Sequence, residues 1–336
     1  MPLILPVFFL ILLGAELLYF RLARTYQISD QPNHRSSHQQ VTLRGGGIIF
    51  PLAWLGYSIW NGFAYPYFTA GLLFIAGISF VDDLRPVSAK LRLGVHLLAF
   101  TLCFWELHVF ELLPWWQWPL AYILCIGIVN AYNFMDGING ITGLYTLALF
   151  VPLAFQWGAP LTLLQATNPF SFLIAALLVF GFFNFRKKAV CFAGDVGSMS
   201  IGFTVLFLLV ARFLGIWASG GPIPERSNSV FVSAGGYDWS VFLFLALYGM
   251  DTILTIAYRL WLKENIFQAH RLHLYQYLAN ECRWPQMVVA GVYAVIQIII
   301  NLWIINSSIT LWAGLSLLLG LVLTYLIVLL YRVKIA

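Results

Sequence analysis

The sequence predicts an all-α, polytopic membrane protein with about 10–11 transmembrane helices. Of its 336 residues, 61% are hydrophobic and only 9% are charged, whereas a soluble domain carries about 25% charged residues. The apolar runs are continuous and about 20 residues long, which is the length that a helix needs to cross the hydrocarbon core. A transmembrane β-barrel would show short alternating segments instead. Because no second domain and no repeat is visible, residues 1–336 are expected to form one integral membrane domain.

The apolar segments mark the spans in order along the chain. The first, 2–22, lacks a basic leading region and a small-residue cleavage site, and we interpret it as a retained span rather than a signal peptide. Further spans are predicted near 45–61, 66–81, 92–110, 117–134, 140–157, 169–185, 198–217, 240–262, 286–305 and 309–331. The segment 218–239 is interpreted as an irregular external loop.

The basic residues indicate an orientation, because the cytoplasmic connections of membrane proteins are enriched in lysine and arginine. One face and its helix ends hold 16 of the 18 basic residues, and only Arg212 and Arg226 fall on the other face. The basic face is therefore predicted to be cytoplasmic, with the N-terminus outside and the C-terminus inside. The basic trio at 186–188 is interpreted as part of this anchor.

Dense polar clusters occur almost only in the connections of the predicted cytoplasmic face. They are "SDQPNHRSSHQQVTLRGGG" (29–47), "VDDLRPVSAKLR" (81–92), "NAYNFMDGINGITG" (130–143), "NFRKKAVCFAGDVGSMSIG" (184–202) and "QAHRLHLYQ" (268–276). Segments that are far apart in the sequence can converge when they share one membrane face. The topology therefore predicts an active site on the cytoplasmic face.

Two adjacent aspartates, Asp82 and Asp83, stand where the third span leaves the membrane. Neighbouring helical residues point about 100° apart, yet both carboxylates can reach one site at a helix end. Two acidic groups near lipid head groups are costly unless they are paired or bind a metal, which favours a functional role. The alternative is a solvated helix terminus in which Asp83 caps the next helix.

The motif "GDVGS" places Asp195 between two glycines at the entry of a span. Glycine allows the backbone to approach a ligand closely, and the N–H groups at the start of a helix favour anions. One carboxylate together with a diphosphate is a usual way to hold Mg²⁺. The alternative is a glycine-rich turn with a helix cap.

The motif "NFMDGING" offers Asn133, Asp136 and Asn139, and Asn130 extends the same spacing of three. This spacing puts side chains on one face of a helix. Amide and carboxyl groups can recognise a ring such as uracil by paired hydrogen bonds, so these residues are candidates for binding a nucleotide. The alternative is polar contact between helices inside the bundle.

Three further features carry weaker signals. "RGGG" (44–47) resembles a phosphate-cradling loop but lacks the lysine and hydroxyl residue of a P-loop, and tight helix packing explains it equally well. "HRLH" (270–273) combines an arginine and histidines that can clamp phosphate oxygens, and the alternative is a solvated basic loop. Asp251 lies in the middle of a span and needs a partner, either functional or structural.

All five clusters, in this order and on one face, resemble the polyprenyl-phosphate N-acetylhexosamine-1-phosphate transferases, enzymes of the glycosyltransferase family 4 type that start cell-envelope glycans. The resemblance covers residues 29–276. It implies a Mg²⁺-dependent enzyme (Mn²⁺ is the alternative metal) in the bacterial inner membrane. The enzyme would transfer N-acetylhexosamine 1-phosphate from a UDP-sugar to undecaprenyl phosphate and release UMP. The implied partners are these two substrates and membrane lipids but no nucleic acid, and relatives often form homodimers.

Residue by residue, the resemblance also implies roles in the site. Asp82 and Asp83 would be catalytic, by activating the lipid phosphate or organising the metal, and Asp195 would bind Mg²⁺. The resemblance would place Asn133 and Asp136 at the nucleotide and Lys90, Arg271 and His273 at the phosphates. Asn130, Asn139 and Asn184 complete the predicted nucleotide-sugar site.

Departures from the family pattern favour one branch of it. Tyr275 and Gln276 stand where many members carry histidines. This form resembles the O-antigen and capsule branch rather than the muramyl-pentapeptide branch. The implied donor is UDP-N-acetylglucosamine or a 6-deoxy relative such as UDP-N-acetylfucosamine or UDP-N-acetylquinovosamine.

A lipid phosphate is a strong nucleophile without much help, because the second pKa of a phosphate monoester is near 6. Direct attack, assisted by positioning and charge neutralisation, is therefore favoured over a two-step route through a phospho-aspartate. The main alternative function is a lipid or solute transporter. A transporter would place its polar site near the midplane between repeats, and no repeat is visible. A CDP-alcohol type phosphotransferase would need an aspartate-rich signature that this sequence lacks.

Overall fold

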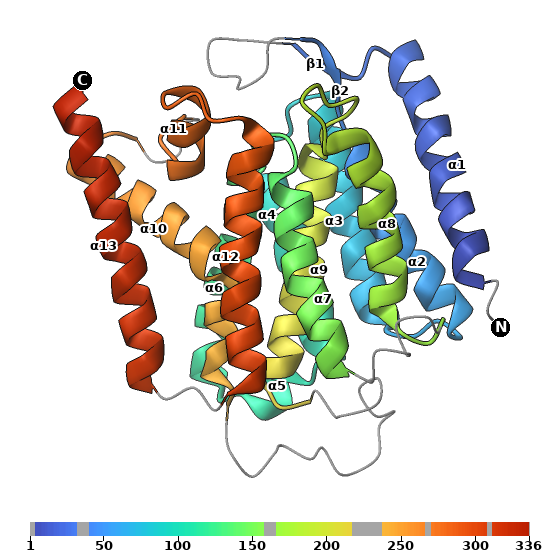
Figure 1. The fold of residues 1–336 in the computed structure, drawn as a ribbon. Helices are drawn as coiled ribbons and strands as arrows, with labels where there is room; N and C mark the ends of the chain where they lie inside the picture. The colour runs from blue at the N-terminus through green and yellow to red at the C-terminus, as the bar shows by residue number, and fades with distance from the viewer. Residues whose placement is uncertain are drawn as a thin grey trace.

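The computed structural model describes residues 4–31, 40–157, 166–216, 237–265, 270–307 and 311–335. It is mostly helical, and its long helices run side by side in one bundle (Figure 1). Within these residues, five helical segments are long and apolar enough to cross a membrane: Ile4–Thr25, Pro66–Leu84, Gly194–Phe213, Trp239–Trp261 and Gln286–Asn306. The chain is therefore a polytopic membrane protein, as its composition predicts.

Each of the apolar segments singled out in the sequence contains helix. The longer helices are α1 (Ile4–Thr25), α2 (Ile49–Trp60), α3 (Pro66–Leu84), α4 (Ala89–Glu106), α6 (Trp118–Phe134), α7 (Ile141–Trp157), α8 (Pro169–Asn184), α9 (Gly194–Phe213), α10 (Ala246–Trp261), α12 (Gln286–Asn306) and α13 (Leu311–Ile335). The 3₁₀ segments η1 (Gly46–Ile48), η2 (Trp115–Gln117) and η4 (Trp239–Leu245) precede α2, α6 and α10. The two ends of the chain lie at opposite ends of the bundle (Figure 1).

Short elements that the apolar pattern does not predict lie between the helices. They are α5 (Val109–Leu112), α11 (Leu274–Asn280) and the antiparallel pair of β1 (Ser29–Asp30) and β2 (Thr42–Leu43), with Ser29 opposite Leu43. Most of the loop 218–239 and part of the first polar cluster, 32–39, lie outside the described residues.

Two helix boundaries differ from the sequence-based prediction in a way that matters for the polar residues. Helix α3 continues to Leu84, so Asp82 and Asp83 lie in its last turn rather than in a loop. Helix α9 begins at Gly194, so Asp195 lies in its first turn. Hydropathy places a boundary where polar residues begin, whereas the backbone hydrogen bonds continue through these residues.

Helix α9 is the central helix of the bundle, and most of its residues are buried. An α-helix that is apolar on all sides is stable when other helices surround it. Helices α3 and α6 pack against α9, and Phe68 of α3 stacks on Phe203 and Phe207 of α9, with ring centroids 5.1 and 4.0 Å apart. These contacts pack the first turn of α3 against the second half of α9, and the last turn of α3 meets the first turn of α9 through Asp83.

Close approach between η1 and α9 depends on two glycines. A Cβ atom on Gly47 would overlap the Cα atom of Gly197, and one on Gly197 would lie 2.7 Å from the Cα atom of Gly47. The N–H of Gly47 also donates to the carbonyl oxygen of Ala193 at 3.0 Å. Small residues of this kind let backbones approach closely inside membrane bundles. Tight packing is therefore the structural reason for the third glycine of "RGGG".

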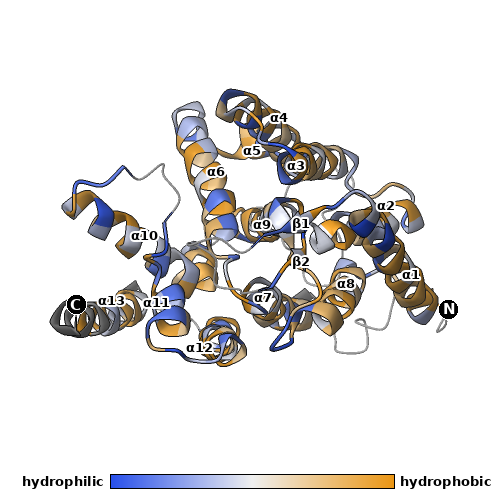
Figure 2. Ribbon diagram, turned by 90° about the horizontal axis from the view of Figure 1, so that it is seen from above, coloured by the Kyte–Doolittle hydropathy of each residue, from blue (hydrophilic) through white to orange (hydrophobic). Residues whose placement is uncertain are grey.

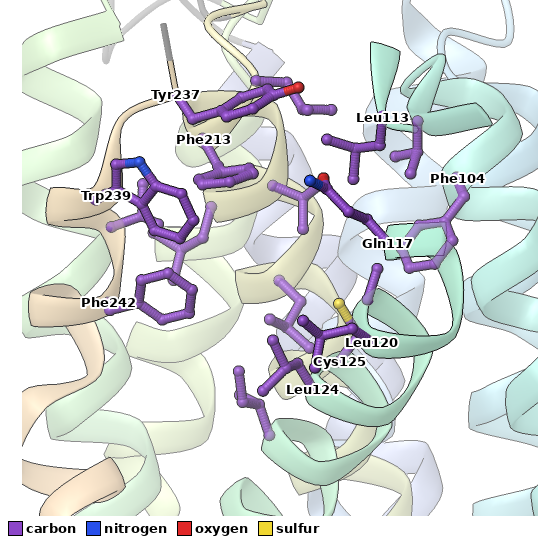
Figure 3. Close-up of a pocket in the computed structure, with 18 of the residues that line it drawn as sticks. Phe104, Leu113, Gln117, Leu120, Leu124, Cys125, Phe213, Tyr237, Trp239 and Phe242 are labelled. Carbon is purple, nitrogen blue, oxygen red and sulfur yellow. The ribbon is translucent and has the colours of Figure 1, made fainter. Parts of the chain in front are cut away.

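An apolar cavity of about 280 Å³ lies between α6, α9 and η4, toward the C-terminal end of α9. Figure 3 shows Phe213, Trp239 and Phe242 on one wall and Leu120 and Leu124 on the facing wall. Asp195 lies at the opposite end of α9. The cavity is therefore separate from the polar cluster at that end.

We expect Gly47→Ala to lower the free energy of unfolding by about 1–3 kcal/mol, because the added methyl group overlaps the backbone of α9. Thermal denaturation of the purified protein in detergent measures this change. The matched control is Gly77→Ala in α3, where an added Cβ meets no atom within 4 Å. The control should keep or slightly raise the melting temperature, since alanine favours a helix over glycine. Equal melting temperatures for the two variants would contradict the role of this contact.

Candidate functional site

The five polar clusters of the sequence meet at one end of the bundle. Arg44 contacts both Asp83 and Asp195, and Ser198 donates to Asn133 at 2.5 Å. The remaining cluster joins through α11, because the Tyr275 hydroxyl donates to the carbonyl oxygen of Phe134 at 3.0 Å. Figure 2, seen from this end, shows hydrophilic residues in the segments that connect the largely hydrophobic helices. The convergence expected from the topology is therefore present in the structure.

The Asp83 carboxylate caps helix α9 rather than the next helix along the chain. Its Oδ1 accepts from the backbone N–H of Asp195 at 2.9 Å, and its Oδ2 accepts from that of Val196 at 3.0 Å. The first N–H groups of a helix have no partner within the helix, and a carboxylate there is also favoured by the helix dipole. Gly194 permits this approach, because a Cβ on it would lie 2.6 Å from Oδ2 of Asp83.

The Arg44 guanidinium bridges the two carboxylates of α3 and α9. Its Nε lies 2.6 Å from Oδ1 of Asp83, and one of its terminal nitrogens lies 3.0 Å from Oδ1 of Asp195. The Asp83 side chain has no exposed surface, whereas the Arg44 side chain is about one-third exposed. Burial acts to lower the pKa of Arg44, but the two carboxylates outweigh it and the net direction is upward. The guanidinium therefore stays charged and neutralises the pair.

The main chain at Arg44 is held independently of its side chain. The Tyr19 hydroxyl donates to the Arg44 carbonyl oxygen at 2.5 Å, and the Arg44 N–H donates to Ile28 at 3.2 Å. The next residues follow into η1, where the N–H of Gly46 donates to Phe192 at 2.9 Å. These bonds present the guanidinium to the carboxylates from a fixed backbone.

Asp82 points to a different part of the site from Asp83. It accepts from the backbone N–H of Val87 at 2.6 Å and from an Arg92 terminal nitrogen at 2.8 Å. Helix α4 itself is capped by Ser88, which accepts from the N–H of Leu91 at 3.3 Å. The alternative in which Asp83 caps the next helix is therefore wrong, since Asp82 orders the α3–α4 turn and Asp83 caps α9.

The candidate nucleotide residues Asn133 and Asp136 lie beside this pair of carboxylates. Asn133 accepts from Ser198, one turn after Asp195, and Asp136 accepts from the Thr142 hydroxyl at 2.7 Å. Burial raises the pKa of Asp136 to about 6, the hydrogen bond from Thr142 opposes the rise, and the charges of Asp195 and Asp83 add to it. Three aspartates therefore influence one another electrostatically at this end of the bundle.

The other three asparagines predicted for the nucleotide are engaged with the backbone. The Asn184 side chain accepts from the N–H of Gly140 and donates to the carbonyl oxygen of Cys191, both at 2.8 Å. Asn139 donates to Arg186 at 3.1 Å, and Asn130 donates to Ile126 on its own helix at 2.7 Å. The contacts of Asn139 and Asn184 order the turn that follows Asp136, whereas that of Asn130 stays within α6.

The predicted phosphate residues occupy three different environments. His273 is buried, and its Nδ1 lies 3.3 Å from Oδ1 of Asp251. Asp251 also accepts from the N–H of Leu274 at 2.9 Å and from the Tyr293 hydroxyl at 2.7 Å. Asp251 is thus a hydrogen-bonding centre that caps α11. Arg271 is partly buried next to this cap, and Lys90 is exposed in the first turn of α4.

The residues present fit a magnesium ion that arrives with phosphate oxygens. Within the described ranges, no three His, Cys, Asp or Glu side chains form a metal-binding group. Mg²⁺ needs only one or two carboxylates when a phosphate supplies further oxygens. Asp83 and Asp195 already share one cation, the Arg44 guanidinium, which shows that this pair attracts a positive charge.

The sequence pattern does not identify Arg44 as a residue of the site. Arg44 enters the pattern only as the first residue of "RGGG" and as one of the basic residues of one face. The signal in the sequence is charge, because several aspartates are predicted for one site and Arg44 is a basic residue next to the glycine run 45–47. The structure adds that this glycine run packs on α9, which carries Asp195. A cluster of carboxylates needs a counter-charge.

Comparison with known proteins reveals relatives along most of the chain. The model of Glycosyl transferase family 4 matches residues 65–212, which run from α3 to α9. A Bacillus subtilis protein described as a probable undecaprenyl-phosphate N-acetylglucosaminyl 1-phosphate transferase is 26% identical over 320 residues, covering 88% of this chain and 82% of that protein. The undecaprenyl-phosphate alpha-N-acetylglucosaminyl 1-phosphate transferase of Escherichia coli K12 is 29% identical, with 58% of each chain covered.

A cyanobacterial relative extends this comparison to a second named activity. The phospho-N-acetylmuramoyl-pentapeptide-transferase of a Synechococcus species is 30% identical over 234 residues, covering 61% of this chain and 67% of that protein. The range that the family model matches contains Asp82, Asp83, Asn133, Asp136 and Asp195. Together, these matches show that this chain belongs to glycosyl transferase family 4.

Proposed function

We propose that the protein transfers N-acetylhexosamine 1-phosphate from a UDP-sugar to undecaprenyl phosphate, with release of UMP. The product would be a polyprenyl diphosphate-sugar that starts a cell-envelope glycan. The single observation that carries the proposal is the Asp83–Arg44–Asp195 group at the N-terminus of α9. It combines two carboxylates and a cation at the start of a helix, at one end of a membrane bundle, where a lipid phosphate and a nucleotide diphosphate can meet.

The donor would lie across Asn133 and Asp136, with its diphosphate toward Asp195. The amide of Asn133 and the carboxyl of Asp136 offer the hydrogen-bonding groups that a uracil ring needs. Asn139 and Asn184 would support this site by ordering the turn after Asp136. UDP-N-acetylglucosamine is the first donor to test, because the Bacillus subtilis and Escherichia coli relatives are named for that sugar.

Mg²⁺ would be held by Asp195, with Asp83 next to it, and it would neutralise the charge of the diphosphate. The chain's own residues would position the reactants. Asp82, Lys90 and Arg271 would orient the acceptor phosphate, and Asp83 would keep the first turn of α9 facing it. One oxygen of the acceptor would form a bond to the sugar-side phosphorus as the bond from this phosphorus to the UMP oxygen breaks. The acceptor is mostly a dianion at neutral pH, so no strong base is required.

The orientation belongs to the same proposal. The polar end of the bundle would face the cytoplasm, where UDP-sugars are made, and the N-terminus would lie outside. Basic residues at that end, including Arg85, Lys90 and Arg92, support this placement. The membrane would be the bacterial inner membrane, since the relatives named above are bacterial.

The decisive experiment measures UMP release by purified protein in detergent with undecaprenyl phosphate, Mg²⁺ and several UDP-N-acetylhexosamines in parallel. We expect lipid-dependent UMP release from one donor and none when Mg²⁺ is removed with a chelator. If the protein is instead a transporter, we expect no UMP release from any donor with folded protein. Vesicles that contain the protein should then transport the donor or the lipid across the membrane.

We expect Asp195→Asn, Asp82→Asn and Asp83→Asn each to lower the turnover number about 100-fold or more. Asp195→Asn would weaken the metal site, and the other two variants would displace the α3–α4 turn and the first turn of α9, which position the phosphates. The matched control is Asp238→Asn, which breaks an aspartate–arginine pair of 2.9 Å with Arg212 after the C-terminal end of α9. The control should keep normal turnover. Full Mg²⁺-dependent activity in folded Asp195→Asn would remove this residue from the metal site.

We expect Asp136→Asn to raise the melting temperature by a few degrees at about pH 8 and by much less at about pH 4. Burial raises the pKa of Asp136 from 3.8 to about 6 in the folded protein. The folded state therefore loses stability as the pH rises through this interval, because the ionised carboxyl is disfavoured there. Asparagine cannot ionise and avoids the loss. A melting difference that does not change with pH would contradict this origin, and lowered UMP release by the stabilised variant would support a role in binding the donor.

A further inference from the structure

The charges at the polar end of the bundle are divided into two sets. Asp82 is paired with Arg92 at 2.8 Å, outside the contact between α3 and α9. Asp83 and Asp195 share Arg44. Asp136 adds a third carboxyl, whose pKa is raised in part by the charges of Asp195 and Asp83. Among the described residues, Arg44 is the basic side chain that forms ion pairs with this second set. Its single positive charge faces up to three negative ones.

Arg44 holds both carboxylates through different nitrogens of one planar group. The contact to Asp83 uses Nε at 2.6 Å, and the contact to Asp195 uses a terminal nitrogen at 3.0 Å. Asp83 also has backbone donors from Asp195 and Val196, so its position does not depend on Arg44 alone. For Asp195, the ion pair with Arg44 is the side-chain contact that the structure provides. A cation that takes over Asp195 must therefore compete with Arg44.

We propose that the Arg44 guanidinium competes with the divalent metal ion for Asp195, so that the metal binds well only together with the donor diphosphate. This inference rests on the proposed function. A free metal ion meets a carboxylate that is already neutralised, and its binding is weak. A donor brings a diphosphate with two negative charges. Its oxygens can accept charge-assisted hydrogen bonds from the N–H groups of Arg44. Metal and donor then favour each other's binding, as two linked ligands must.

The competition has a consequence for catalysis. An arginine that moves from a carboxylate to a phosphate keeps its charge in the site, whereas a lysine has no planar fork with which to contact two acceptors at once. Arg44 is then a positioning residue for the metal and for the diphosphate. Its main chain is held by Tyr19 and Ile28, and that of Gly46 by Phe192, so the side chain can change partners while the loop stays in place.

The test measures Mn²⁺ binding to the purified full-length protein by electron paramagnetic resonance, with no donor and no lipid present. We expect Arg44→Gln to bind Mn²⁺ about tenfold more tightly than the wild type, because the competing cation is gone. The matched control is Arg92→Gln, which removes an arginine of similar exposure that pairs with Asp82 instead. Loss of a nearby positive charge alone should raise its Mn²⁺ affinity by less than about threefold.

A second readout and a second variant keep the test decisive. Arg44→Gln should melt below the wild type without metal, and Mn²⁺ should raise its melting temperature more than that of the wild type. If Arg44→Gln does not fold, Arg44→Lys should bind Mn²⁺ between twofold and tenfold more tightly than the wild type. Unchanged or weaker Mn²⁺ binding by the folded variant would overturn the proposal. Absence of UMP release by the wild type would instead count against the proposed function, since Mn²⁺ binding is measured without either substrate.

Discussion

The capping of α9 by Asp83 is the contact on which the rest of the polar end depends. The carboxylate satisfies two backbone N–H groups that have no partner within α9. It thereby joins the end of α3 to the start of α9 across 112 positions of the chain. Gly194 makes room for it, and Arg44 neutralises it. The buried Asp83 carboxyl is tolerated here because all three conditions are met together.

The two ends of α9 illustrate how one buried helix serves two environments. Its first turn carries Asp195 and faces the polar clusters, whereas its last turns line an apolar cavity. Arg212, near the C-terminal end, pairs with Asp238. The positive charge of Arg212 at this end and the carboxylate of Asp83 at the start both interact favourably with the helix dipole. The helix between them has apolar residues on every side and is held by aromatic contacts such as Phe68 with Phe207. The bundle therefore fixes the polar group with a rigid, fully packed element.

The sequence predicted the helices and the convergence of the polar clusters for reasons that hold in any bilayer. Continuous apolar runs must become helices, because backbone groups need partners that hydrocarbon does not offer. Alternation of spans then assigns "VDDLRPVSAKLR", "NAYNFMDGINGITG" and the segment around Asp195 to one face. The predicted end of α3 and the predicted start of α9 each differ from the structure by a few residues, because polar residues occur within turns that are still helical.

The composition and the order of the apolar runs are sufficient to predict a helical membrane protein with its polar residues gathered at one end. Packing between distant helices selects which of two adjacent aspartates meets α9 and which stays with its own turn. The sequence does not distinguish Asp82 from Asp83, because they are identical neighbours. Their side chains point in different directions because they lie about 100° apart on a helix, and the packing of that helix fixes which side faces α9. The structure alone also brought Arg44 into the site, because its partners lie in two distant helices.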